Sequence, residues 1–574
     1  MSNEVYGLLT DRKGGYMLLG PSIATSRFQG WYLGTTSAPL RVIESLHINE
    51  ELSEVSTALT SIQRRYATIT EDLGYVRGLP AIAQRLSKKT SVELIIDGKR
   101  IDDHREWGRR YTIHHQDGIV LVEFQKKEDE KEPRDGEYQW WLAIASEDLH
   151  LLPQEQWIEH AYTYDQERAS PPFKRYVFFA ATINAREVVY AVGQDKESAF
   201  TTAKEAWAKR ESAWKVHDRL TTVHPKGEIN HAYHAARHAL CSLLGPQGLQ
   251  AGLPWFHQVW SRDAAISLPA LMMIGHEQDA KRIALELLKN IGDDGLVPII
   301  IHPKSTDRCF DAAGWLFFSL HFLIERHPRL FSQDEIDTIL STLHSAISTV
   351  KSLMQKDDFI ETPNGMSWMD ASYGGDTRLG ARIEHQALFL AMLKFQRVHG
   401  RKNGASEKEF AAKVRYHFFK NHYLYDGKDD PMIRPNVFLA HHVYPELLTN
   451  SEWEQCFDRV LTQLWLPWGG LSSIDTQHKL FTGHHTGENP QSYHRGDSWY
   501  WINNLAAISL EQVNKKKYAS YIIKILNAST KDILTLGALG HHSELSSALS
   551  QTGQGCMSQA WSAAMYVELV NSIT

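Results

Sequence analysis

The hydrophobic pattern changes once along the chain, near residue 196. Before that point, short alternating or β-branched runs such as SVELIIDG and RYVFFAATI are separated by Gly, Asp, Pro and charged residues. Runs of this length and period are typical of strands in an antiparallel sandwich. We therefore expect residues 1–195 to form an N-terminal antiparallel β-sandwich domain.

From residue 196 onward, apolar residues recur at helical spacing. Residues 196–228 are rich in Ala, Lys and Glu and end near a Pro-Lys-Gly turn, which predicts a helical linker. In residues 229–574 the clearest helix begins at a capping box formed by Ser332 and Glu335. Two further helices, 498–511 and 515–527, are predicted close together in the chain.

About twelve helical segments fit into residues 229–574, joined by long connectors rich in Gly and Trp. An even number of helices with long connectors is typical of a barrel of paired helices around a central pocket. The competing architecture is an open helical solenoid, but no fixed sequence repeat supports it. We therefore predict an (α/α)6 barrel as the C-terminal domain.

Composition excludes several functional classes. An apolar content of 43% and a charged content of 22% describe an ordinary globular protein. A net charge of -7 gives no basic surface for a nucleic-acid partner. The chain has no signal pattern and no apolar run long enough to span a membrane, so we expect no membrane partner and a cytoplasmic location. The oligomeric state cannot be read from the sequence.

The four cysteines are far apart and form no CxxC motif, and the histidines show no zinc-like spacing. We therefore expect no disulfide scaffold, no metal and no organic cofactor. The aromatic content is more informative, because many of the 17 Trp and 22 Tyr lie beside Gly, His or Asp. Such rings suit stacking on sugars, although a Trp excess is equally compatible with core packing.

Asp370 is the first candidate catalytic residue. It directly follows Trp368 and Met369 and precedes a Gly-rich loop, after which Glu384 opens a helical run. An apolar setting raises the pKa of a carboxyl group and keeps it protonated, as a general acid requires. If the reaction is glycoside hydrolysis, a second carboxylate must activate water or attack the sugar carbon, and Glu544, in a polar loop, suits that role. The simpler interpretation of Asp370 is a surface Asp that caps a helix.

Other polar and aromatic candidates lie in connectors or at predicted helix starts. In a helical barrel such positions converge on one mouth, although an Asp at a helix start can also act only as a cap. These candidates are Trp255, Trp260, Arg262, Asp263, Asp311, Trp315, His494, Asp497 and Trp499.

Seven blocks of the chain resemble, in order, the amylo-α-1,6-glucosidase domain of glycogen debranching enzymes, especially the short archaeal and bacterial type. They are GLPWFHQVWSRDAAISLPAL, FDAAGWLFFSL, SWMDAS, GARIEHQALFLAML, IRPNVFLA, SYHRGDSWYWI and GQGCMSQAWSAAM. The N-terminal GLLTDRKGGYMLLG and SRFQGWYLG are similar to that family's N-terminal domain. The resemblance therefore covers nearly the whole chain.

The resemblance implies a β-sandwich on an (α/α)6 barrel that hydrolyses α-1,6-linked glucose in branched α-glucans, as part of glycogen breakdown. It implies Asp370 as the general acid and Glu544 as the base, with inversion at the anomeric carbon. The glucose pocket would be lined by Arg262, Asp263, Asp311, Trp315, Trp368, Glu384 and His494. Trp255, Trp260, Asp497 and Trp499 complete the expected substrate-binding set.

The chain departs from the family pattern at three places. Ser261 replaces the usual Gly before Arg-Asp, Gln29 replaces a His, and Arg495-Gly496-Asp497 replaces Gln-Gly-Thr. An added Arg and Asp in a sugar pocket would alter the subsites or the preferred linkage. Asp497 is also the alternative candidate for the base.

The sequence argues against one further function and leaves two alternatives. The chain lacks room for a separate α-amylase-like barrel of roughly 250 residues, so a 4-α-glucanotransferase activity is not expected. Another enzyme of the same architecture, a trehalase or glucoamylase, is the first alternative. The second is a non-catalytic glycan-binding protein, in which Asp370→Asn would leave glycan affinity intact.

Overall fold

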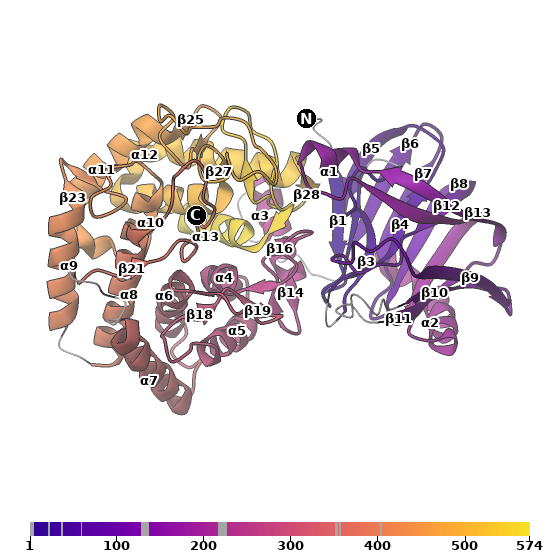
Figure 1. Ribbon diagram of the computed structural model, residues 1–574, viewed down its shortest axis with the longest axis horizontal. Coiled ribbons are helices and arrows are strands. Elements are labelled where there is room, and N and C mark those ends of the chain that lie inside the picture. Colours follow the sequence, from indigo (N-terminus) through magenta and orange to yellow (C-terminus); the bar gives the residue numbers. More distant parts are fainter. Residues whose placement is uncertain are drawn as a thin grey trace. The chain divides into compact units, whose positions relative to one another are not determined.

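The computed structural model describes residues 5–20, 23–35, 38–58, 60–127, 137–215, 227–350, 354, 358–401 and 404–573. The chain divides into two units, Met1–Thr222 and Val223–Thr574. Figure 1 shows strands in the first unit and mainly helices in the second.

The first unit is built on antiparallel strands. They are β1 (Tyr6–Thr10), β2 (Tyr16–Leu19), β3 (Gly30–Leu33), β4 (Leu40–His47), β5 (Leu52–Thr57), β6 (Ser61–Tyr66), β7 (Thr70–Tyr75), β8 (Ala81–Ile96), β9 (Arg109–Gln116), β10 (Ile119–Lys126), β11 (Tyr138–Ala145), β12 (His150–Ala161) and β13 (Lys174–Gly193). The short helix α1 (Thr163–Glu167) precedes β13.

Two long strands, β8 and β13, belong to both layers of the sandwich. The first half of β8 pairs with β7 and its second half with β4, while the middle residues 87–89 are exposed. The first part of β13 likewise pairs with β12 and its last part with β11, with a register shift between Ala185 and Glu187. Because such irregularities bend a strand, each long strand passes from one layer into the other.

The core lies between these layers. Trp31 and Val42 of one layer and Ile62 and Leu73 of the other belong to one buried cluster. The layers approach closely at Gly7, where an added Cβ would lie 2.6 Å from the Ile62 side chain. The predicted β-sandwich is therefore confirmed.

The helix α2 (Lys196–Lys209) begins at a capping box made by Asp195 and Ser198. Its Phe200 and Ala203 pack against the outer face of the sheet, on a cluster that includes Val189. A 3-10 turn, Arg210–Trp214, follows. Of the stretch assigned to a helical linker, this first part thus packs on the sheet, and residues 216–226 lie outside the described residues.

The second unit contains twelve helices among its described residues, if α12 is counted as two. They are α3 (Glu228–Ser242), α4 (Ser261–Met273), α5 (Glu277–Lys289), α6 (Asp311–Arg326), α7 (Gln333–Val350), α8 (Ile383–His399), α9 (Ala405–Phe418), α10 (Asn436–Val443), α11 (Asn450–Leu464), α12 (Tyr500–Thr535) and α13 (Ala560–Ile573). The backbone of α12 is non-helical at Asn514, which separates two helices where the hydrophobic pattern predicts a break.

Six of these helices form a closed inner ring. Around the ring, α4 packs on α6, α6 on α8, α8 on α10, α10 on α12, α12 on α13 and α13 on α4. Six helices lie outside the ring: α3, α5, α7, α9, α11 and the part of α12 after Asn514. Of these, α3, α5, α7, α9 and α11 pack against the ring (Figure 1). The inner helix α4 is buried along Ser261–Leu271, whereas α7 buries one stripe only, as expected for an inner and an outer layer. The predicted (α/α)6 barrel is confirmed.

Short two-stranded ribbons stiffen the connectors of the barrel. They are β14 (Leu244–Gly245) with β15 (Gly248–Leu249), β16 (Gly252–Leu253) with β30 (Ser558–Gln559), β17 (Val259–Trp260) with β19 (Ile300–His302), β18 (Val297–Pro298) with β20 (Arg308–Cys309), β21 (Glu361–Thr362) with β22 (Gly380–Ala381), β23 (Phe419–Lys420) with β24 (Tyr423–Leu424), β25 (Trp465–Leu466) with β26 (Gly470–Leu471), and β27 (Ser498–Trp499) with β29 (Leu545–Ser546).

Three further expectations can be compared with the structure. The capping box of α7 is confirmed, because the Ser332 amide donates to Glu335 Oε2 (2.7 Å) and the Glu335 amide to Ser332 Oγ (3.3 Å). All four cysteines are free thiols. Within the described ranges, no helix has both the length and the apolar character needed to cross a membrane.

Candidate active site

Several of the candidate residues lie at the starts of the inner helices. Arg262 and Asp263 lie in the first turn of α4, Asp311 begins α6 and Glu384 lies in the first turn of α8. Trp499 immediately precedes α12. Because an outer helix returns the chain between successive inner helices, the inner helices run in the same direction. Their starts therefore meet at one end of the ring.

Arg262 connects two of the candidate carboxylates. Its Nε donates to Asp311 Oδ2 (2.5 Å) and its Nη1 lies 3.5 Å from Asp370 Oδ2. Its Nη2 donates to the carbonyl oxygen of Ser367 (3.0 Å). The guanidinium is buried, so these contacts hold it rigidly and direct one N–H toward Asp370.

Asp370 has a second partner on its other oxygen. His494 Nε2 lies 3.5 Å from Asp370 Oδ1. The Asp370 side chain is 35% exposed, whereas the side chains of Arg262 and His494 are 4% and 2% exposed. The carboxyl group is therefore held on one side by the protein and remains accessible on the other.

The expectation that apolar neighbours raise the pKa of Asp370 is wrong. Burial alone would raise it, but the hydrogen bond from His494 and the positive charge of Arg262 outweigh that effect and lower the pKa below its usual value. Trp368 and Met369 are both buried, and Trp368 Nε1 donates to Asn436 Oδ1 (2.8 Å).

Glu544 is fixed at both oxygens. The hydroxyl of Tyr493 donates to Oε1 (2.6 Å) and the backbone amide of Cys556 donates to Oε2 (2.8 Å). Gly555 permits this approach, because its φ is +65° and an added Cβ would lie only 2.3 Å from Glu544 Oε2. The carboxylate is thus held in one orientation by a loop that only glycine allows.

Asp370 and Glu544 contact two residues that are adjacent in the chain, His494 and Tyr493. Glu544 binds the hydroxyl of Tyr493, Asp370 lies beside His494, and the rings of Tyr493 and His494 have centroids 4.8 Å apart. Burial, followed by the charges of Glu544 and Asp370, raises the pKa of Tyr493 well above its usual value. Tyr493 therefore stays protonated and donates a hydrogen bond to Glu544.

Asp497, the alternative base, lies within the network of its own loop. Its Oδ2 accepts from Ser492 Oγ (2.7 Å) and contacts His485 Nδ1 at 2.8 Å, and the side chain is fully buried. Its neighbour Arg495 donates to the carbonyl of Ala371 (2.8 Å). Arg495 and Asp497, which depart from the family pattern, therefore stabilise the loops around Asp370.

The predicted tryptophans differ in accessibility. Trp315, Trp368 and Trp499 are only 1%, 2% and 2% exposed. Trp315 packs edge-to-face on Trp501 and Trp368 on Trp499, while Trp499 also stacks on His494. Trp255 and Trp260 are half-buried, with Trp260 edge-on to Phe256 at 5.4 Å. The two half-buried rings are the ones that retain surface for a sugar.

Asp263 and Glu384 are both enclosed. Asp263 accepts from Gln559 Nε2 (2.8 Å), and burial raises its pKa to about 7 despite the charge of Arg262. Glu384 pairs with Arg378 (2.6 Å), which also pairs with Asp426. These carboxylates are thus committed to contacts within the protein.

Several residues of the site were not predicted as members. Tyr493 could have been found, because it directly precedes the predicted His494. Arg378, Asp426 and Gln559 carry no comparable signal, since their roles depend on pairing with residues from other segments. The Cys556 contribution is a backbone amide, which residue type cannot reveal.

Comparison with known proteins identifies a family and a fold. A family model described as amylo-alpha-1,6-glucosidase matches residues 239–568, more than half of the chain. A bacterial glucoamylase complexed with acarbose superposes with a TM-score of 0.64 at 13% identity, covering 99% of this chain and 93% of that one. A GH63 mannosylglycerate hydrolase from Thermus thermophilus gives a TM-score of 0.45 at 11% identity, covering 58% and 99%. No curated protein matches the sequence.

The barrel, its acidic end and the family match together define a glycoside hydrolase. More narrowly, the chain belongs to the amylo-α-1,6-glucosidase family.

Proposed function

We propose that this enzyme removes α-1,6-linked glucose at branch points of glycogen or a related α-glucan, with inversion, using Asp370 as general acid and Glu544 as general base. The observation that carries this proposal is the meeting of both carboxyl groups at the adjacent rings of Tyr493 and His494. The family match supports the α-1,6 linkage. Action on an intracellular storage glucan would place the enzyme in the cytoplasm.

Asp370 suits the acid because it keeps an open side. A sugar ring that covers this side removes water from the carboxyl group, which favours its neutral, protonated form. The glycosidic oxygen then takes the proton as the bond to the anomeric carbon breaks. Arg262 and His494 stabilise the carboxylate that remains.

Glu544 suits the base because its orientation is fixed. A carboxylate offers about four acceptor positions, and here one on each oxygen is used by Tyr493 and the Cys556 amide. A carboxylate held in this fixed orientation can deprotonate a water molecule. In an inverting enzyme that water attacks from the face opposite the leaving group, across a carboxyl separation of about 6.5–9.5 Å.

Substrate preference tests the linkage. Purified enzyme is incubated with branched limit dextrin, maltose and trehalose at equal molar concentrations, and the released glucose is followed. We expect the highest kcat/KM on the branched dextrin. A preference for maltose would identify a glucoamylase-like activity, and a preference for trehalose a trehalase.

Amide substitution tests the two catalytic roles. We expect Asp370→Asn and Glu544→Gln each to lower kcat by at least about 10²–10⁴-fold, because proton transfer by a positioned group contributes that much. Glycan affinity, measured by calorimetry, should stay within a few fold of the unmodified enzyme. Unchanged turnover in either variant would contradict its assignment.

Asp497→Asn is the matched control for Glu544→Gln. Because Asp497 is enclosed by Ser492 and His485, we expect this change to lower the melting temperature and to leave most of the turnover intact. A turnover loss in Asp497→Asn that equals the loss in Glu544→Gln, with an unchanged melting temperature, would transfer the role of base to Asp497.

A further inference from the structure

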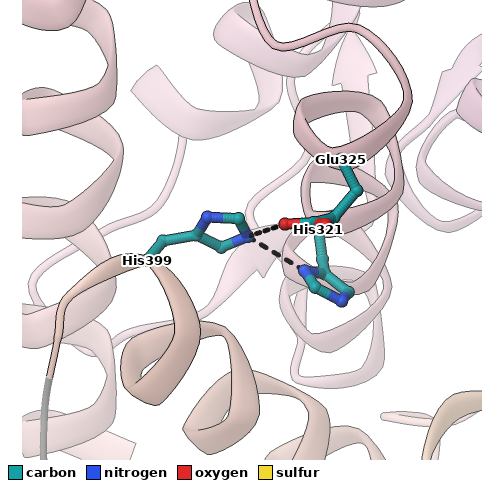
Figure 2. A group of neighbouring side chains, drawn as sticks. All are labelled: His321, Glu325 and His399. Carbon is teal, nitrogen blue, oxygen red and sulfur yellow. Dashed lines mark hydrogen bonds and ion pairs between the residues drawn. The ribbon is translucent and has the colours of Figure 1, made fainter.

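A second cluster of ionisable side chains lies at the other end of the barrel. His321 and Glu325 are one turn apart on α6, and His399 lies in the last turn of α8. Figure 2 shows the His399 ring pointing at both side chains of α6. At about 1.5 Å per residue, His321 is ~15 Å along α6 from Asp311, so this cluster is separate from the candidate active site.

The distances within the cluster fit a metal ion. One ligand atom from each residue lies within 4.8 Å of the other two. His321 Nδ1 is 2.9 Å from His399 Nε2, which in turn is 3.9 Å from Glu325 Oε1. A tetrahedral ion with bonds of about 2.0–2.2 Å needs ligand atoms ~3.3 Å apart. The observed distances lie on either side of that value.

Small side-chain movements would complete the geometry. The Glu325 side chain is 57% exposed, so its carboxylate can rotate toward the two imidazoles without displacing packed atoms. His321 and His399 are half-buried beside Phe395 and are therefore already held in place. The helix carries the pair four residues apart, which places both on one face.

The electrostatic setting also favours a cation. The carbonyl ends of α6 and α8 add partial negative charge. Lys394 faces His321 and opposes a cation, but its ammonium is paired with Glu446 at 2.6 Å.

We propose that His321, Glu325 and His399 bind one divalent cation of the zinc type, with water completing the coordination, and that the ion ties α6 to α8. Imidazole and carboxylate ligands in this number suit Zn²⁺. The sequence alone predicts no metal site here, because the third ligand comes from another helix and residue spacing does not reveal it.

Binding can be measured on the full-length protein after chelator treatment and dialysis. We expect calorimetry to give one Zn²⁺ per chain, and Co²⁺ to give the intense visible absorption of a tetrahedral site. His399→Gln and Glu325→Gln should each weaken Zn²⁺ binding at least tenfold and abolish the rise in melting temperature that Zn²⁺ causes in the unmodified protein.

The control variant is His302→Gln. His302 forms a similar pair with Glu286, at 3.8 Å, but no third ligand accompanies it among the described residues. This variant should bind Zn²⁺ like the unmodified protein. Melting curves of all variants without metal, and their dextrin hydrolysis, confirm that they are folded.

Two outcomes would overturn the proposal. One is an unmodified protein that binds no Zn²⁺ at micromolar concentrations. The other is equal binding by the unmodified protein, His399→Gln and Glu325→Gln, which would assign any bound zinc to other histidines.

Discussion

Asp370 lies between two donors from distant parts of the chain, Arg262 Nη1 and His494 Nε2, each at 3.5 Å. Burial opposes ionisation, but these donors prevail and lower the pKa of the carboxyl group. In the free enzyme Asp370 is therefore ionised at neutral pH. The protonated form of Asp370, which catalysis needs, is favoured only when substrate covers the carboxyl group.

This ionisation predicts the pH dependence of catalysis. Because kcat/KM reports the free enzyme, it should fall as pH rises through the lowered pKa of Asp370. His494→Ala removes a donor that stabilises the carboxylate, so the pKa of Asp370 should rise. The basic limb of the kcat/KM profile should then move to higher pH, whatever the loss in absolute rate.

His485→Ala is the control for this experiment, because His485 contacts Asp497 and not Asp370. Its basic limb should stay where it is in the unmodified enzyme. If the limb of His494→Ala also stays in place, then Asp370 is not the group that it reports.

The residue types at the site were largely predictable, but their environments were not. Asp370, Glu544, Arg262 and His494 were identified from local motifs. The predicted direction of the Asp370 pKa shift is wrong, because Arg262 and His494, which lower the pKa, come from distant segments of the chain. Whether a side chain packs inward, as Trp368 does, depends on contacts between segments that a single sequence does not display.

At the scale of elements, α6 and α8 pack closely at Gly314. Gly314 of α6 faces Leu388 of α8, and a Cβ added at Gly314 would lie 2.6 Å from the Leu388 Cβ. An atom attached directly to the backbone cannot move aside unless the helix moves. This close contact holds together the two helices that begin at Asp311 and near Glu384.

Gly314→Ala measures this contact by the sign of its effect. Helix propensity alone would stabilise the variant by about 1 kcal/mol. We expect instead a lower free energy of unfolding, by about 1–3 kcal/mol, because the added methyl group overpacks the interface. Chemical denaturation checks this, with Ser341→Ala on the exposed face of α7 as a control for propensity. A stabilised Gly314→Ala would show that the helices can separate freely.

Helix positions followed well from hydrophobic periodicity, including the break at Asn514. The passage of β8 and β13 between two layers did not, because it depends on which strands pair with each half. Hydrophobic periodicity indicates which face of a strand or helix is buried, whereas the strands that pair with it depend on the whole fold.

At the scale of the whole molecule, a closed ring of six helices brings distant motifs to one end. Arg262, Asp370, His494 and Glu544 come from four separate segments and form one connected set through their contacts. Such a set needs the complete ring. Family membership identifies a glycosidase, and the proposal of an inverting α-1,6-glucosidase depends on how this set acts on substrate.

The most direct test is to follow the anomeric protons of released glucose by NMR during the first minutes of hydrolysis of a branched limit dextrin. We predict that β-glucose appears first and that α-glucose follows only by mutarotation, because water activated by Glu544 attacks opposite the leaving group. Initial release of α-glucose, or no release of glucose from this substrate, would contradict the account.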